Sequence, residues 1–174
     1  TAAGDYAVTG RGYDPTGHVE RAGAKLRASD DARLARASEV ALACTHARLR
    51  REGDGWRALG DPTEAALIVM AHKAWADPTD PNAVIAELPF TSDRKRMSVL
   101  IRRPDGNRIL TKGAPELVID LCTGIEGPDG PLPLTPEGVE EARAAAHAMA
   151  EEGLRVIALA HRKTCLLYTA ASPR

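Results

Sequence analysis

The stretch Ile109-Leu110-Thr111-Lys112-Gly113-Ala114-Pro115-Glu116 runs from an apolar strand into the start of a short helix. Gly113 allows another group to approach the backbone closely. Lys112 would lie at the end of the strand, beside a helix N-terminus that favours anions. The simpler alternative is an exposed lysine in a loop. The junction is therefore the first candidate for an anion site.

The segments around this junction predict an α+β fold, with an antiparallel β-sheet flanked by helices. Asp105-Gly106 lies between apolar runs at 97–102 and 108–111, a pattern typical of a β-hairpin. Further hairpins or strands are expected at 6–17, 48–59, 84–88 and 154–160, with 124–133 as a Gly/Pro-rich loop. Helices are expected at 30–47, 61–72, 114–121 and 135–152. This order lacks strict βαβ alternation.

Three residues are expected to cap helices. Asp30 would begin the first helix, Asp61 the second and Thr135 the last. Pro62 and Pro136 follow two of these caps at the first helical position, where proline is tolerated. Glu64 falls in the first turn, where the helix dipole stabilises a carboxylate. Its alternative role is to accept a hydrogen bond from an exocyclic amine such as that of adenine.

Two more residues have both a structural and a functional interpretation. Phe90, the only phenylalanine, follows a proline and precedes the basic stretch Arg94-Lys95-Arg96. It could stack on a base or belong to the core. Arg155 opens an apolar strand, where it could be an edge charge or could reach phosphates.

Composition and missing motifs exclude several classes of function. The 174 residues carry a formal net charge of −1, which argues against nucleic acid as a partner. No apolar run reaches the roughly 20 residues that span a bilayer, so no direct membrane contact is expected. The three cysteines and five histidines form no metal-binding pattern. P-loop and Rossmann fingerprints are also absent.

Taken in order, these segments resemble the nucleotide-binding (N) domain of P-type ATPases, in the branch of calcium, sodium/potassium and related cation pumps. The resemblance rests on Asp61-Pro62-Thr63-Glu64, on 94–98 and above all on Lys112-Gly113-Ala114-Pro115-Glu116. It implies an N domain over residues 1–163, with 164–174 unassigned. It also implies a cytoplasmic domain of an integral membrane protein, expected to be monomeric.

The resemblance further implies a site for ATP. Phe90 would stack on adenine and Glu64 would accept its amine. Lys112 would line the inner end of the pocket. The remaining expected site residues are Ser92, Lys95, Met97, Gly113, Ala114, Arg155 and Ile157. Many calcium pumps carry a phosphate-facing arginine where this chain has Ser92, so phosphate contacts are expected to be fewer.

The catalytic residues of that family are not in this sequence. D-K-T-G-T, T-G-D and G-D-G-x-N-D are all absent, so the isolated chain is expected to be catalytically inactive. The nucleophile and the magnesium site would lie in the rest of a parent pump, whose phosphorylation and actuator domains are the expected partners of this chain. The alternative is a non-enzymatic regulatory or interaction domain that kept this fold and lost the nucleotide.

Overall fold

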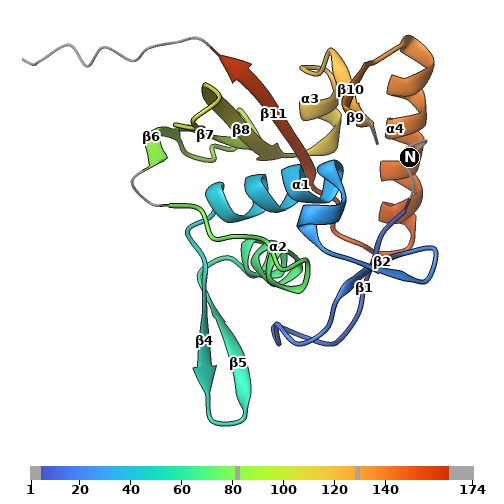
Figure 1. Cartoon of the computed structure of the whole chain (residues 1–174). Helices are drawn as coiled ribbons and strands as arrows, with labels where there is room; N and C mark the ends of the chain where they lie inside the picture. Colours follow the sequence, from blue (N-terminus) through green and yellow to red (C-terminus); the bar gives the residue numbers. More distant parts are fainter. Residues whose placement is uncertain (1–4, 81–82, 128–129, 165–174) are drawn as a thin grey trace, which may run out of the picture.

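The computed structural model describes residues 5–80, 83–127 and 130–164. Its centre is an antiparallel sheet with strand order β11-β8-β7-β6 (Figure 1). The strands are β6 (Val84–Leu88), β7 (Arg96–Ile101), β8 (Asn107–Gly113) and β11 (Ala158–Thr164). The expected α+β class with an antiparallel sheet is confirmed.

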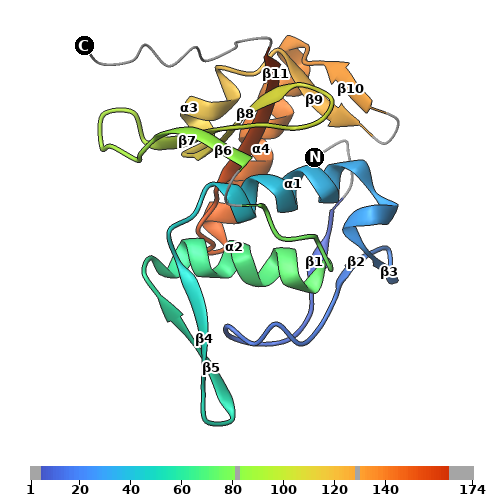
Figure 2. The same cartoon turned by 60° about the vertical axis from the view of Figure 1, so that its left-hand side comes forward.

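Helices cover this sheet in layers (Figure 2). α1 (Ala32–Ala43) contacts β8 and β11, and α2 (Pro62–Lys73) packs on α1 away from the sheet. On the other side of the sheet, α3 (Pro115–Ile119) contacts β8 and β11, and α4 (Pro136–Glu151) packs against α3. In the described part of the chain, no helix is both long and apolar enough to cross a membrane.

The core lies between α1 and the sheet because side chains alternate along β7. Met97, Val99 and Ile101 are buried on one face, next to Leu110 of β8 and Val40 of α1. Successive residues of a strand point to opposite faces, so this single stripe fixes which face meets α1. The register of β7 against β8 is thereby set, and with it the position of Lys112.

Three smaller β-structures surround this unit. One is a three-stranded sheet and two are hairpins, of which β4–β5 extends beyond α2 (Figure 1). Their strands are β1 (Ala7–Val8), β2 (Val19–Arg21), β3 (Ala24–Leu26), β4 (Arg48–Glu52), β5 (Gly55–Leu59), β9 (Gly124–Gly127) and β10 (Gly130–Pro133).

Two of the three expected caps are confirmed. The Asp61 carboxylate accepts hydrogen bonds from the amides of Thr63 and Glu64, and the Thr135 hydroxyl accepts one from Gly138. The expected cap at Asp30 is wrong. Asp31 caps α1, because a short 3₁₀ turn takes up Asp30. α1 also ends at Ala43, earlier than expected.

Two other expectations about local structure are wrong. The stretch 124–133 was expected to be a loop, but β9 and β10 pair across it as a hairpin. The last strand was expected at 154–160, but β11 begins only at Ala158 and continues to Thr164. Thr164 is the first residue of the expected unassigned tail, and residues 165–174 lie outside the described ranges.

Candidate functional site

Four strand ends meet at one end of the central sheet. Leu88, the last residue of β6, is paired with Ser98 near the start of β7. Gly113, the last residue of β8, lies between Arg96 of β7 and Ala158 of β11. This region, defined by Leu88, Arg96, Gly113 and Ala158, is called the converging end below. Antiparallel pairing brings candidate segments that are far apart in sequence to this one edge.

A buried ion pair joins α2 to the converging end. The Lys112 ammonium lies 2.6 Å from Oε1 of Glu64. The side chains of Lys112 and Glu64 are only 10% and 16% exposed. Lys112 is held between Met97 of β7 and Leu159 of β11, its register partners. Two of the expected ATP-binding residues are thus bonded directly to each other.

The other carboxylate oxygen of Glu64 is bound by the loop that follows α1. Oε2 accepts hydrogen bonds from the amide of His46 at 2.8 Å, the amide of Ala47 at 3.0 Å and the hydroxyl of Thr45 at 3.3 Å. An ionised carboxylate has about four acceptor positions. Lys112 and this loop therefore already use the hydrogen-bonding capacity of Glu64.

These contacts keep Glu64 ionised. Burial by itself raises the pKa of the Glu64 carboxyl. The hydrogen bond from Lys112 and those from the His46 and Ala47 amides outweigh burial, so the pKa lies below its ordinary value. A negative charge at the start of α2 is also stabilised by the helix dipole.

Position 113 requires glycine because another segment of the chain lies against it. A Cβ at Gly113 would lie 2.6 Å from both the Lys95 carbonyl oxygen and Cβ of Arg96. Ala114 donates its amide to the same Lys95 carbonyl at 3.0 Å. The close approach expected at Gly113 is therefore confirmed, and the group that approaches is the basic segment at 94–96. These contacts hold Lys95 beside Ala114.

Phe90 stands at the converging end as an exposed ring. It lies two residues beyond β6 and is 59% exposed, as is the neighbouring Leu88. The alternative in which Phe90 belongs to the core is wrong. A large aromatic side chain open to solvent at a polar edge is available to stack on a planar ligand.

The other residues from 92 to 97 differ in exposure. Ser92 is exposed in the turn after Phe90, and the exposed side chain of Lys95 forms a 3.9 Å ion pair with Glu116. Met97 is 1% exposed and belongs to the core. The structure thus places Ser92 and Lys95 at the surface and Met97 beneath them, alongside Lys112. A ligand contact of Met97 stays a prediction.

Arg155 and Ile157 were expected to lie on a strand, but they do not. They precede β11 in an extended segment that leads to Ala158, the partner of Gly113. Arg155 is exposed and Ile157 is half-buried. Both therefore approach the converging end from the β11 side.

Neither the loop Thr45–Ala47 nor Glu87 could be recognised from the sequence as part of this region. The loop binds Glu64 chiefly through backbone amides, which leave no signature in a sequence. His46 also contacts Glu87 of β6, with its Nε2 3.0 Å from the nearer carboxylate oxygen. Within 5–80, 83–127 and 130–164, no group of three or more His, Cys, Asp or Glu is placed to hold a metal ion.

Comparison with known proteins gives a family match. Residues 33–169 match the family model described as P-type ATPase, cytoplasmic domain N. This range contains every candidate residue of the converging end, from Glu64 to Ile157.

Individual relatives agree with that match. The "Probable cation-transporting ATPase F" of Mycobacterium tuberculosis is 37% identical over 166 residues, covering 91% of this chain and 18% of the relative. The Aspergillus fumigatus "Endoplasmic reticulum calcium ATPase srcA" is 31% identical, covering 88% and 19%. The "Calcium-transporting ATPase type 2C member 1" of Bos taurus is 34% identical, covering 88% and 16%. The chain spans less than a fifth of the length of these curated relatives.

Proposed function

This chain belongs to the family of cytoplasmic N domains of P-type ATPases, and we propose that it binds ATP at the converging end of its sheet. One observation carries the proposal. The exposed ring of Phe90, the Glu64–Lys112 pair and the basic residues Lys95 and Arg155 come from four separate segments that approach the same end of the sheet. A planar face with several cations beside it suits a nucleotide.

Adenine would stack on Phe90, with its amine directed to Glu64. Because Glu64 already accepts four hydrogen bonds, the amine must replace one of them. The bonds from the Thr45 hydroxyl and the Lys112 ammonium are the two that a side-chain rotation can release, and of these we propose that the Lys112 bond is replaced. Nucleotide binding would then free the Lys112 ammonium to turn toward the ligand. Gly113 and Ala114 would form the floor of the pocket beside it.

The phosphates would lie along the basic side of the site. Arg155 and Lys95 are exposed cations on opposite flanks of Gly113. Ile157 would cover the nucleoside, and Ser92 would supply only a hydroxyl. A site with few direct contacts and much solvent implies a dissociation constant of about 0.1–5 mM, or roughly −3 to −5.5 kcal/mol.

The chemical step would take place on another domain. This sequence has no aspartate in a D-K-T-G-T segment. The domain would hold ATP while its γ-phosphate is transferred to an aspartate of the phosphorylation domain, with magnesium bound there and the actuator domain as a further partner. Phosphoryl transfer depends on positioning and charge neutralisation, and this chain would supply positioning.

Calorimetric titration with ATP and GTP tests the proposal. Guanine has a carbonyl where adenine has the amine, so Glu64 should disfavour GTP. We expect ATP to bind at least about fivefold more tightly than GTP, a difference of about 1 kcal/mol. Glu64→Ala should abolish that preference. Absence of ATP binding at 10 mM, which is about twice the weakest expected constant, would favour the regulatory domain without nucleotide.

A further inference from the structure

A cavity of about 570 Å³ lies away from the converging end, where the β4–β5 hairpin meets α2. Its apolar walls come from Leu42 of α1, Leu49 and Trp56 of the hairpin, and Ile68 of α2. Cavities of this volume with mostly apolar walls are typical of small-molecule sites. None of the residues expected to bind ATP lines this cavity.

The aromatic wall is supplied by one face of the hairpin. Trp56 is paired with Arg51 and Leu49 with Ala58, so these four side chains share a face. Leu49 and Ala58 pack toward Ile68. Trp56, further along the hairpin, is 36% exposed and borders the cavity. A planar ring could therefore stack on Trp56 while its edge contacts the aliphatic wall.

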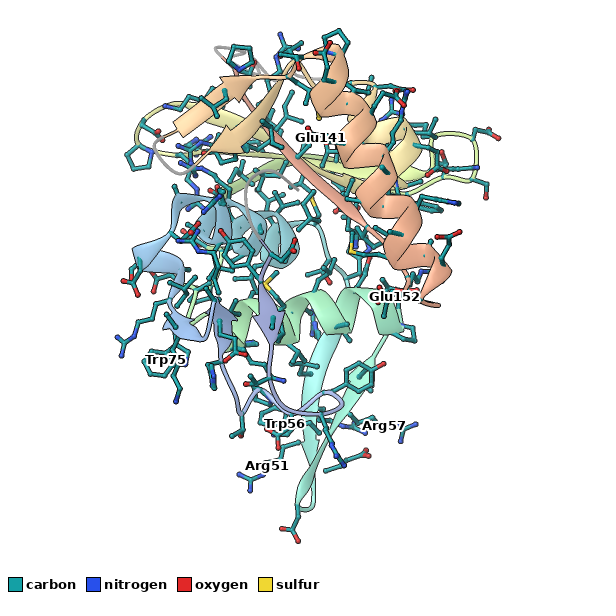
Figure 3. The ribbon with its side chains drawn as sticks, turned by 90° about the vertical axis from the view of Figure 1, so that its right-hand side faces the viewer. Arg51, Trp56, Arg57, Trp75, Glu141 and Glu152 are labelled. Atoms are coloured by element: carbon teal, nitrogen blue, oxygen red, sulfur yellow. The ribbon has the colours of Figure 1, made fainter. Side chains whose placement is uncertain are left out.

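The side chains around the cavity are mainly basic, although Asp14, next to Pro15 of the lining, interacts electrostatically with Arg51. The lining contains Arg48 and His72 but no Asp or Glu. Arg51 lies directly opposite Trp56 on the same face. Within the part of the chain that the structure describes, neither Arg48 nor Arg51 lies within ion-pair distance of a carboxylate. Figure 3 shows Arg51 and Trp56 on one side of the hairpin and Arg57 on the other. Arg57 is instead placed beside Glu52, at 3.5 Å.

We propose that this cavity is a second ligand site, which binds a planar aromatic compound bearing one anionic group. The ring stacks on Trp56 and the anion is met by Arg51 at the mouth. This site is independent of the proposed ATP site. Two residues link it to that site, since Thr45 and Ala47 both line the cavity and donate hydrogen bonds to Glu64.

The test uses naphthalene-1-sulfonate as the probe and 1-naphthalenemethanol as its uncharged counterpart. The chain has two tryptophans, whose indole N–H signals are separated by NMR and assigned with Trp75→Phe. We expect saturable shifts of the Trp56 signal with a dissociation constant of about 1 mM for the sulfonate. The Trp75 signal, at the opposite end of α2 from the hairpin (Figure 3), should stay in place.

Matched variants distinguish specific binding in the cavity from nonspecific attraction of the anion to basic side chains. Arg51→Gln should weaken sulfonate binding about threefold and leave binding of the alcohol unchanged, whereas Arg57→Gln should change neither. Phe90→Ala should also have no effect. The proposal is overturned if the Trp56 signal does not shift at 10 mM, which is about ten times the expected constant. It is also overturned if the two arginine variants weaken binding equally, or if binding requires Phe90.

Discussion

At the scale of single residues, Glu64 has two roles that compete for the same oxygens. Its carboxylate accepts hydrogen bonds from the loop Thr45–Ala47 and from Lys112. The proposed contact with the adenine amine would have to replace one of these four bonds. The sequence could identify Glu64 and Lys112 as site residues from their motifs. It could not predict that they bind each other, because that contact depends on how the fold places the start of α2 beside the end of β8.

The Glu64–Lys112 pair should contribute to stability even without ligand. Removing one partner leaves a largely buried charge uncompensated, which is strongly destabilising. We expect Lys112→Met and Glu64→Gln each to lower the free energy of unfolding. The double variant should lose about 1–3 kcal/mol less than the sum of the two. Urea denaturation of the four proteins measures this coupling, and strictly additive losses would show that the pair is not formed in solution.

Phe90 should matter for ligand binding and little for folding. Its ring is 59% exposed, so truncation removes few packing contacts. Loss of base stacking, roughly 1–3 kcal/mol, should weaken ATP binding by at least about fivefold in Phe90→Ala. Calorimetry gives the affinity and a thermal melt gives the stability. Leu88→Ala, an equally exposed neighbour, is the control. A large fall in melting temperature would mean that the ring is buried in solution.

At the scale of elements, the junction of β8 and α3 depends on the absence of a side chain at Gly113. The turn at 91–96 lies against this position, and its Lys95 carbonyl accepts the Ala114 amide. The sequence predicted a close approach here because glycine permits one. It could not identify the approaching group, since β7 and β8 are paired through a register that only the folded core fixes.

Gly113→Ala should therefore destabilise the fold, even though it adds only a methyl group. Its Cβ would lie 2.6 Å from the Lys95 carbonyl oxygen and 2.6 Å from Cβ of Arg96. Forced overpacking of this kind costs about 1–3 kcal/mol. Gly55→Ala, where the nearest atom to the added Cβ is 3.8 Å away, is the control. Equal stability of the two variants in chemical denaturation would contradict the tight contact at Gly113.

The N-terminus of α1 should make stability depend on pH. Burial raises the pKa of Asp31, but hydrogen bonds from Arg33, the Leu34 amide and Tyr6 lower it to about 2. Because the folded pKa lies below the unfolded value, this stabilisation is complete above about pH 5 and is lost as the pH falls toward 2.

Asp31→Asn keeps a capping side chain but does not titrate. The stability advantage of the wild-type protein over this variant should narrow by about 1 kcal/mol between pH 7 and pH 3. Urea titrations at both pH values measure the change. An advantage that stays constant, or grows on acidification, would contradict the lowered pKa.

Other elements show where sequence patterns were insufficient. Asp61-Pro62 and Asp105-Gly106 predicted α2 and the β7–β8 hairpin because local chemistry decides helix starts and tight turns. The stretch 124–133 was taken for a loop because its glycines and prolines disfavour strands, although β9 and β10 pair there. The apolar run 154–160 indicated a strand, but pairing with β8 determines that β11 begins at Ala158.

At the scale of the whole molecule, antiparallel topology accounts for the site. The ends of β6 and β8 and the starts of β7 and β11 lie at one end of the sheet, so segments separated by up to about 70 residues in sequence become neighbours. The α+β class could be predicted from the mixture of hairpins and helices. The convergence of the site residues followed only from strand order and register.

The central claim is that ATP binds at this converging end, and NMR titration of the isolated chain with ATP tests it most directly. We predict saturable shifts of the Phe90, Lys112 and Gly113 amides, with a midpoint of about 0.1–5 mM. His46 and Ala47 should shift with them, because they bind Glu64. The β9–β10 hairpin should stay unchanged. If the Phe90 and Lys112 signals do not move at 10 mM ATP, about twice the weakest expected constant, or if all amides shift alike, the account is contradicted.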